Sequence, residues 1–168
     1  EHTVATVERA SRLGLPPHPL LFLEFHGSQA SVVEQAETVE AIAREHGGKG
    51  FQWATQPEAR SALWDARHAA YWACLGLRPG ARAISTDVCV PLSRLAECVR
   101  ETMEDVKNYI DPVPILGHVG DGNFHVMPLF ESGNAEERRR VQGFLDRLVE
   151  RASVVLDCSD NFSTRHAV

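Results

Sequence analysis

The chain has 168 residues, a formal net charge of −6 at pH 7 and 43% hydrophobic residues. This size and composition are typical of a single globular domain that can bury a core. The acidic balance argues against a nucleic-acid or membrane-surface partner, because those partners select basic patches, and no apolar run reaches the roughly 18 residues of a transmembrane helix.

Five elements are predicted in the first half of the chain from hydrophobic spacing and from helix-stop residues. The longest helix has apolar residues near every third or fourth position and ends at Gly47-Gly48. Another long helix begins at Pro57, which suits a first turn because its missing N–H would have no helical partner there. In chain order the elements are a helix over 3–13, a strand over 20–26, a helix over 28–46, a short strand over 51–54 and a helix over 57–75.

The second half of the chain predicts a strand, a helix, a hairpin and a last helix. The strand contains Ile84, Val88 and Val90, and the helix has an apolar stripe formed by Leu92, Leu95, Val99, Met103 and Val106. Hairpin-linked strands interleaved with helices predict an α+β fold of ferredoxin-like type, with an antiparallel sheet and helices packed on one face. The ranges are 81–90 for the strand, 91–109 for the helix, 114–127 for the hairpin and 134–150 for the last helix.

The hairpin contains the most specific pattern in the sequence, GHVGDGNFH. Asp121-Gly122 between apolar runs is a hairpin signal, because a type I′ turn needs positive φ at both central residues. With this turn at the tip, His118 faces His125 across the two strands, and opposed side chains point to the same face. The two imidazoles could share a metal ion or form a polar face toward water, and spacing alone leaves both readings open. Two nitrogen ligands are also fewer than the three protein ligands of a typical catalytic zinc.

The GHVGDGNFH segment resembles the GHxGDGNxH motif of FAD-linked 2-hydroxyacid dehydrogenases, which have the vanillyl-alcohol-oxidase type of flavoprotein architecture. The segments LLFLEFHGS (20–28) and STDVCVP (85–91) resemble the same family, and the likeness runs over about residues 3–149. Within the family it points to the cytochrome-linked D-lactate dehydrogenases. The resemblance implies FAD, bound mainly by a separate N-terminal domain, and a divalent metal, zinc or manganese, held by His118 and His125.

The resemblance also assigns roles to two further residues. Residues 63–68 resemble the family's LWxxR segment, in which the arginine clamps the substrate carboxylate, so Arg67 is the expected substrate-binding residue. A guanidinium can hold a carboxylate through two parallel hydrogen bonds; the alternative is a solvated Arg67 paired with Asp65 or Glu58. Asn123 is expected to face the flavin or the substrate. The sequence assigns no catalytic acid or base.

Residues 85–98 add three expectations. Ser85 stands where family members that act on larger diacids have a lysine, which favours a small monocarboxylate such as lactate. Asp87 is an unusual charge for a strand, and we expect it either at a solvated edge or beside a histidine or arginine that it orients. Cys89 and Cys98 are expected to be buried small hydrophobes. The four cysteines form no C-x-x-C pair, which suits a reducing compartment.

After the last helix the sequence departs from the family. Relatives continue into a GEHGxG segment with a glutamate metal ligand and a histidine proposed as the base, whereas this chain has SVVLDCSDNFSTR over 153–165. Residues 154–165 resemble the VLDCxDNxxTR segment of ubiquitin-activating-type adenylyltransferases of thiamine and molybdopterin biosynthesis, in which Asp160 would lie near Mg-ATP. We therefore expect residues 1–152 to be an incomplete FAD-linked oxidase C-terminal (substrate or cap) domain, and 153–168 to be a foreign or junction-like tail.

The sequence thus predicts a substrate- or cap-domain fragment of an FAD-dependent D-2-hydroxyacid dehydrogenase, with D-lactate as the expected substrate and little or no activity in the isolated chain. The expected partners are a small 2-hydroxy acid and an FAD-binding domain missing from this chain. The expected location is the cytoplasm or the mitochondrial matrix, with the full-length protein peripheral to a membrane. The alternative is a non-catalytic α+β module that binds a metal or a small acid.

Overall fold

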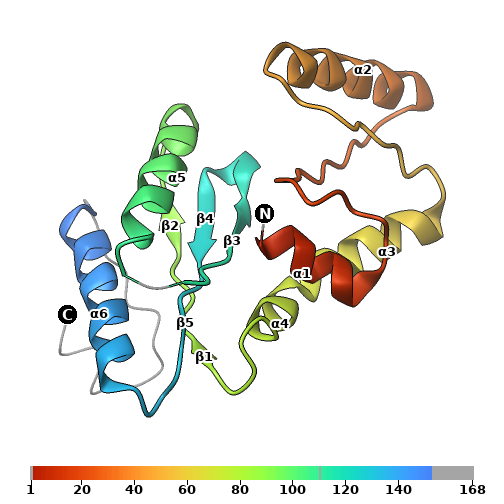
Figure 1. The fold of residues 1–168 in the computed structure, drawn as a ribbon. Helices are drawn as coiled ribbons and strands as arrows, with labels where there is room; N and C mark the ends of the chain where they lie inside the picture. The colour runs from red at the N-terminus through yellow and green to blue at the C-terminus, as the bar shows by residue number, and fades with distance from the viewer. Residues whose placement is uncertain (1, 110, 153–168) are drawn as a thin grey trace, which may run out of the picture. The chain divides into compact units, whose positions relative to one another are not determined.

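The computed structural model describes residues 2–109 and 111–152, so the predicted foreign tail over 153–168 lies outside the described residues. The chain divides into two compact units, Glu1–Cys74 and Leu75–Val168 (Figure 1). Within the described ranges, no helix is both long enough and apolar enough to cross a bilayer.

The first unit is helical. Helix α1 packs against α3, and the buried apolar side chains are small except for Val7. The Ser28 side chain caps α2 by accepting from the Ser31 N–H at 3.3 Å, which satisfies one of the unpaired N–H groups of the first turn. The helices are α1 His2–Ser11, α2 Gln29–Glu45, α3 Pro57–His68 and α4 Ala70–Leu75, the last of which reaches into the second unit.

Three predictions for the first unit are wrong. The helix predicted over 57–75 is interrupted at Ala69 and forms α3 and α4. The strands predicted over 20–26 and 51–54 have no regular structure, because a strand needs a hydrogen-bonded partner and none of the described strands pairs with either segment. Leu21 and Leu23 are correspondingly 65% and 50% exposed, and the rings of Phe51 and Trp53 contact each other edge to face at 5.4 Å.

The described residues of the second unit form two antiparallel sheets. One has the order β2-β4-β3 and the other is the pair β1-β5. Together with α5 and α6, the larger sheet has the chain order β-α-β-β-α with the first strand beside the third, which matches a ferredoxin-like fold up to its second helix. The elements are β1 Arg82–Ala83, β2 Val88–Cys89, α5 Leu92–Val106, β3 Ile115–His118, η1 Val119–Asp121, β4 Asn123–Val126, β5 Leu129–Phe130 and α6 Ala135–Glu150.

The single strand predicted over 81–90 occurs as two short strands that keep one register. Arg82 pairs with Phe130 in β1-β5, and Val88 pairs with Phe124 in β2-β4. Between them the Ile84 N–H donates to the Pro128 carbonyl at 3.4 Å in the same register. Pro128 has no N–H to return, so the ladder is weakened at this point and the strand is divided.

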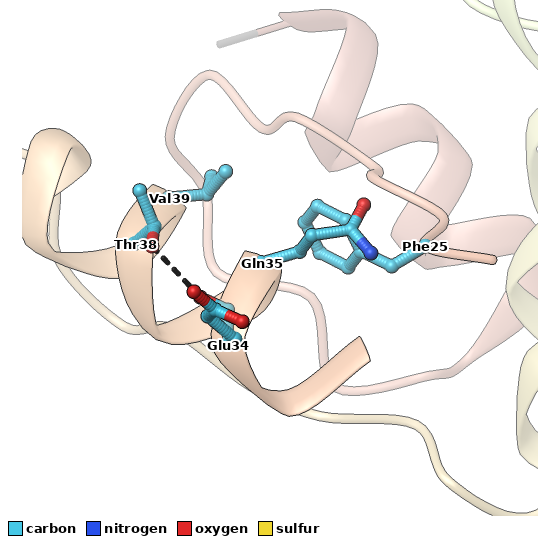
Figure 2. A pocket seen from close by; sticks show the side chains of 5 residues that line it. All are labelled: Phe25, Glu34, Gln35, Thr38 and Val39. Atoms are coloured by element: carbon cyan, nitrogen blue, oxygen red, sulfur yellow. Dashed lines mark hydrogen bonds between the residues drawn. The ribbon is translucent and has the colours of Figure 1, made fainter. Parts of the chain in front are cut away.

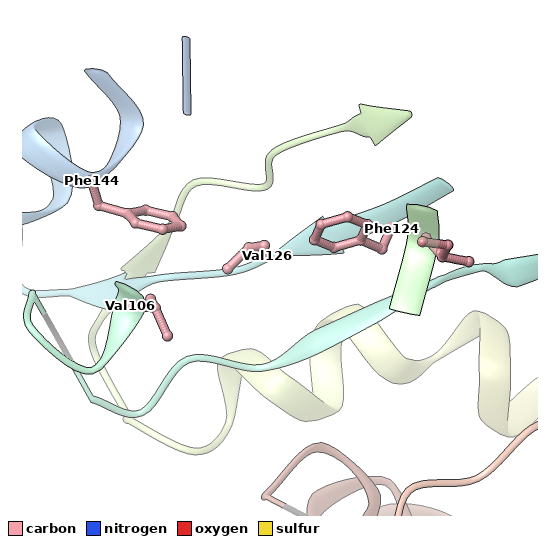
Figure 3. Packing of buried hydrophobic residues seen from close by; sticks show 5 residues of the cluster. Val106, Phe124, Val126 and Phe144 are labelled. Atoms are coloured by element: carbon pink, nitrogen blue, oxygen red, sulfur yellow. The ribbon is translucent and has the colours of Figure 1, made fainter. Parts of the chain in front are cut away.

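The core of the second unit lies between the larger sheet and its two helices. Phe124 and Val126 from β4 pack with Leu95 and Val106 from α5 and with Phe144 from α6 (Figure 3). Both helices therefore cover the same face of the sheet. The predicted α+β class, the antiparallel pairing and the placement of helices on one face are confirmed.

Candidate functional site

The GHVGDGNFH segment folds as a hairpin whose register differs from the predicted one. Strands β3 and β4 pair Leu116 with His125 and His118 with Asn123. The prediction that His118 stands directly opposite His125 is wrong, because the connection is a 3₁₀ turn over Val119–Asp121 followed by Gly122. Within this connection only Gly122 has a positive φ, 71°. The expected two-residue type I′ turn needs two residues with positive φ.

Two glycines of the motif are required by close backbone approach. A Cβ at Gly122 would lie 2.2 Å from the Val90 carbonyl oxygen, and one at Gly117 would lie 2.4 Å from the Asn123 carbonyl oxygen. Gly120 has nothing within 4 Å of its Cβ position. The turn is thus held against Val90, and within the hairpin β3 is held close to β4 at Gly117.

The two histidines still share one face of the sheet, because side chains alternate with a period of two and the register is shifted by two residues. The rings of His118 and His125 have centroids 5.9 Å apart and planes at 88°. His118 is exposed, and the His125 side chain is 23% exposed. The predicted proximity of these two imidazoles is therefore confirmed, although they are diagonal neighbours instead of directly opposed ones.

The Nδ1 atom of His125 faces the segment between β1 and β2. It lies 3.0 Å from the carbonyl oxygen of Thr86 and 3.7 Å from the Asp87 carboxylate. A carbonyl oxygen only accepts hydrogen bonds, so this contact is a hydrogen bond only if Nδ1 carries a proton, and in a neutral ring of that tautomer Nε2 has the free lone pair. The expectation that Asp87 lies beside a histidine is confirmed, and its side chain is also 72% exposed.

Asn123 is 8% exposed. Its side-chain amide nitrogen contacts atoms of β2 and of Asp87, the residue before β2. It donates to the Asp87 carboxylate and to the Val88 carbonyl at 3.3 Å, and it lies 3.3 Å from the Cys89 sulfur. The Cys89 thiol is exposed, so the expectation of a buried Cys89 is wrong: this residue points to the face that the helices do not cover. Cys98 is partly buried.

We call this surface the polar face of the sheet. It combines one carboxylate, one thiol, one amide and two imidazoles, contributed by β2, β3 and β4 and by the residue before β2. Its residues are Asp87, Cys89, His118, Asn123 and His125.

Arg67 lies in the last turn of α3 in the first unit, whereas the polar face belongs to the second unit. On the same helix the rings of Trp64 and His68 stack with centroids 6.3 Å apart. The assignment of Arg67 to a substrate carboxylate remains a prediction.

The described part of the chain contains no group of three or more His, Cys, Asp or Glu side chains that could hold a metal ion. Two imidazoles therefore supply two nitrogen donors, and any further ligand has to come from elsewhere. Neither histidine lines either of two shallow cavities in the described part of the chain. One, of about 410 Å³, is lined by Phe25 and by residues of α2, where Thr38 donates to the Glu34 carbonyl at 2.8 Å (Figure 2). The other, of about 400 Å³, lies between β1, β5 and α6.

Comparison with known proteins identifies relatives over most of the chain. Residues 2–168 match the family described as FAD linked oxidases, C-terminal domain. The chain is 48% identical over 144 residues to the "Probable D-lactate dehydrogenase, mitochondrial" of Danio rerio, covering 86% of this chain and 29% of that protein.

Two further relatives have similar names. The "D-lactate dehydrogenase [cytochrome], mitochondrial" of Arabidopsis thaliana is 37% identical over 142 residues, which is 84% of this chain and 25% of that protein. The protein of the same name from Kluyveromyces lactis is 30% identical over 155 residues, 89% of this chain and 26% of that protein. The chain thus spans less than a third of the length of these curated relatives.

Proposed function

The chain belongs to the family of FAD-linked oxidases, C-terminal domain, and from this premise we propose that it is the substrate-binding part of an FAD-dependent D-2-hydroxyacid dehydrogenase. The proposed substrate is D-lactate, after the names of the relatives, and the product is the 2-oxo acid. The observation that carries the proposal is the polar face, where His118 and His125 lie with ring centroids 5.9 Å apart. The flavin would be held mainly by a domain outside this chain and would accept the hydride.

The proposal includes a divalent metal, zinc or manganese, held by His118 and His125. The chemistry of the donor set supports it in part, because the Nδ1 contact of His125 with the Thr86 carbonyl leaves Nε2 as a lone-pair donor, as in most metal-binding histidines. A third protein donor is lacking among the described residues. When bound, such a cation would supply Lewis-acid chemistry at the substrate oxygens.

The remaining proposed roles concern binding. Arg67 would hold the substrate carboxylate through two parallel hydrogen bonds. Ser85 supplies no cation for a second carboxylate, which suits a monocarboxylate such as lactate. Asn123 already directs its amide nitrogen to Asp87 and Val88, so its amide oxygen is the atom left to face a flavin or substrate. A mitochondrial location is proposed on the names of the relatives alone.

Metal binding to the purified chain tests the first part of this proposal. Isothermal titration with zinc and with manganese is expected to show one site, weakened at least about tenfold in His118→Asn and in His125→Asn, because each change removes one of two nitrogen donors. The matched control is His46→Asn, an exposed histidine at the end of α2. Equal affinity in all four proteins would remove the metal from the proposal.

Flavin bleaching tests the catalytic part. The isolated chain is expected to retain no FAD and to leave D-lactate unchanged. A longer protein that contains this chain and a flavin domain is expected to lose its FAD absorbance on anaerobic addition of D-lactate but not of L-lactate, and Arg67→Lys should raise the D-lactate concentration required. If the longer protein binds FAD and metal but is not reduced by D-2-hydroxy acids, a non-catalytic binding module is the better description.

A further inference from the structure

Thr86 and Val126 form a pair in the ladder between the β1-β2 segment and the β4-β5 segment, but they do not exchange the usual two backbone hydrogen bonds. The Thr86 N–H donates to the Val126 carbonyl at 3.0 Å, as an antiparallel pair requires. The Val126 N–H, which would normally donate to the Thr86 carbonyl, donates to the Thr86 hydroxyl oxygen at 3.0 Å. The hydroxyl of Thr86 therefore takes the place of its own carbonyl in the ladder.

The carbonyl oxygen released in this way has a different partner. It lies 3.0 Å from Nδ1 of His125, the residue next to Val126. The Asp87 carboxylate lies farther from the same nitrogen, at 3.7 Å, which is beyond ordinary hydrogen-bond distance. The Thr86 carbonyl is thus the acceptor that can decide which ring nitrogen of His125 carries the proton.

We infer that Thr86 is a positioning residue, whose hydroxyl completes the ladder so that its carbonyl can hold His125 in the tautomer with the proton on Nδ1 and the lone pair on Nε2. Use of that lone pair toward a metal or substrate rests on the proposed function, but the tautomer itself does not. The hydroxyl is essential to the arrangement because Val126 is fully buried, and an unpaired buried N–H is costly.

Three substitutions test the contribution of the Thr86 hydroxyl separately from that of the Asp87 charge. Thr86→Val keeps the shape of the side chain but removes the hydroxyl. The Val126 N–H then has an acceptor only if the carbonyl of residue 86 turns back into the ladder. In that case His125 loses the carbonyl as its hydrogen-bond acceptor. Thr86→Ser keeps the hydroxyl and is expected to behave as the parent chain. Asp87→Asn removes the nearby charge and leaves the Thr86 carbonyl in place, so it is expected to leave the His125 tautomer unchanged.

The test is long-range ¹H–¹⁵N NMR of the histidine rings of the full chain, without metal or substrate, at about pH 8 where a typical imidazole is neutral. His125, assigned by the loss of its signals in His125→Asn, is expected to show a protonated Nδ1 and an unprotonated Nε2 in the parent chain, in Thr86→Ser and in Asp87→Asn. Thr86→Val is expected to shift the ring toward the Nε2-protonated tautomer.

Three outcomes would overturn the inference: an Nε2-protonated His125 in the parent chain, an unchanged tautomer in a folded Thr86→Val chain, or a changed one in Asp87→Asn. If Thr86→Val does not fold, the parent chain and Asp87→Asn still decide. A parent chain with the expected tautomer and no metal affinity would keep Thr86 in this role while counting against the metal in the proposed function, so the two failures are distinguishable.

Discussion

The side-chain amide of Asn123 donates to the carboxylate of Asp87, a residue 36 positions earlier in the chain. The amide is almost buried, at 8% exposure of the residue, while the Asp87 side chain is 72% exposed. Asp87 therefore does not need this contact for solvation. The contact instead holds the carboxylate over the sheet, 3.7 Å from Nδ1 of His125.

Asn123→Asp is expected to destabilise the chain by roughly 2 to 4 kcal/mol at pH 7, because it replaces a donor by a second carboxylate beside Asp87 and the Val88 carbonyl. Asn123→Ala, which only loses the hydrogen bonds, should cost about 1 to 2 kcal/mol. Burial and the like charge raise the pKa of the introduced carboxyl, so its excess penalty is present above that pKa and disappears below it. Urea unfolding at pH 7 and at about pH 4 checks this, and equal stability of the two variants at pH 7 would contradict it.

How far the site could be predicted is best judged from the hairpin. The sequence pattern was sufficient to place a turn at Asp121-Gly122 and two histidines on one face. It did not give the register, because a 3₁₀ turn that starts at Val119 and a type I′ turn at Asp121-Gly122 both need a glycine at position 122. The difference is decided by the close approach of Gly122 to Val90, which is a contact with a segment about 30 residues away and is invisible to local propensity.

The helices show the same division between local and tertiary information. The period of 3.6 residues predicted α5 to within a few residues, and Leu95 and Val106 from its expected stripe are buried. Met103, from the same stripe, is 48% exposed because the buried row passes through Thr102 instead. The first unit was predicted less well, since the segment 20–26 alternates as a strand does but finds no partner in the described part of the chain.

Gly122→Ala is expected to destabilise the chain by about 2 kcal/mol or more. An alanine at φ 71° costs roughly 1 to 2 kcal/mol in the left-handed region, and its Cβ would lie 2.2 Å from the Val90 carbonyl oxygen. Gly120→Ala in the same loop is the matched control, since its Cβ position is open, and a change within about 0.5 kcal/mol is expected. Denaturant unfolding of the two variants measures the difference, and equal stabilities would mean that the turn is not held against Val90.

The cysteines of the two units should differ in reactivity. Burial raises the pKa of the Cys74 thiol to about 11, so at pH 8 this thiol is almost entirely in its unreactive protonated form. Cys89 is exposed on the polar face. Iodoacetamide at pH 8 is therefore expected to modify Cys89 at least about tenfold faster than Cys74.

Mass spectrometry of the separate cysteine-containing peptides measures these rates one residue at a time. In urea both thiols should react at similar rates, because the burial of Cys74 is lost. Similar rates in the native chain would contradict the buried position of Cys74.

Arg78 connects the loop after α4 to the start of α6. Its guanidinium makes two hydrogen bonds with the Glu137 carboxylate, at 2.9 and 2.7 Å, and lies 3.2 Å from Glu131. The hydrogen bond from Arg78, followed by one from the Glu131 backbone, lowers the pKa of Glu137. This is a bidentate pair with both side chains mostly shielded, at 25% and 19% exposure, which is the geometry in which an ion pair contributes most reliably.

A lowered pKa gives a definite sign to the pH dependence of stability. Because Glu137 titrates below the ordinary value of a glutamate, the contribution of the pair is present above that ordinary value, near pH 4.5, and is lost as the pH falls through the lower folded-state pKa. Glu137→Gln should therefore lower the melting temperature at pH 7 and 5, and the difference from the parent chain should close below about pH 4.

The matched control is Glu136→Gln, one residue earlier in the same helical turn, whose carboxylate is 52% exposed and pairs with Arg139 and Arg140 along the helix. It shares the effect of the helix dipole but lacks the contact with Arg78, so a smaller shift that weakens with added salt is expected. Thermal melts followed by circular dichroism at several pH values make the comparison, and a constant difference between parent and Glu137→Gln down to about pH 3 would show that the carboxylate charge is not what stabilises this junction.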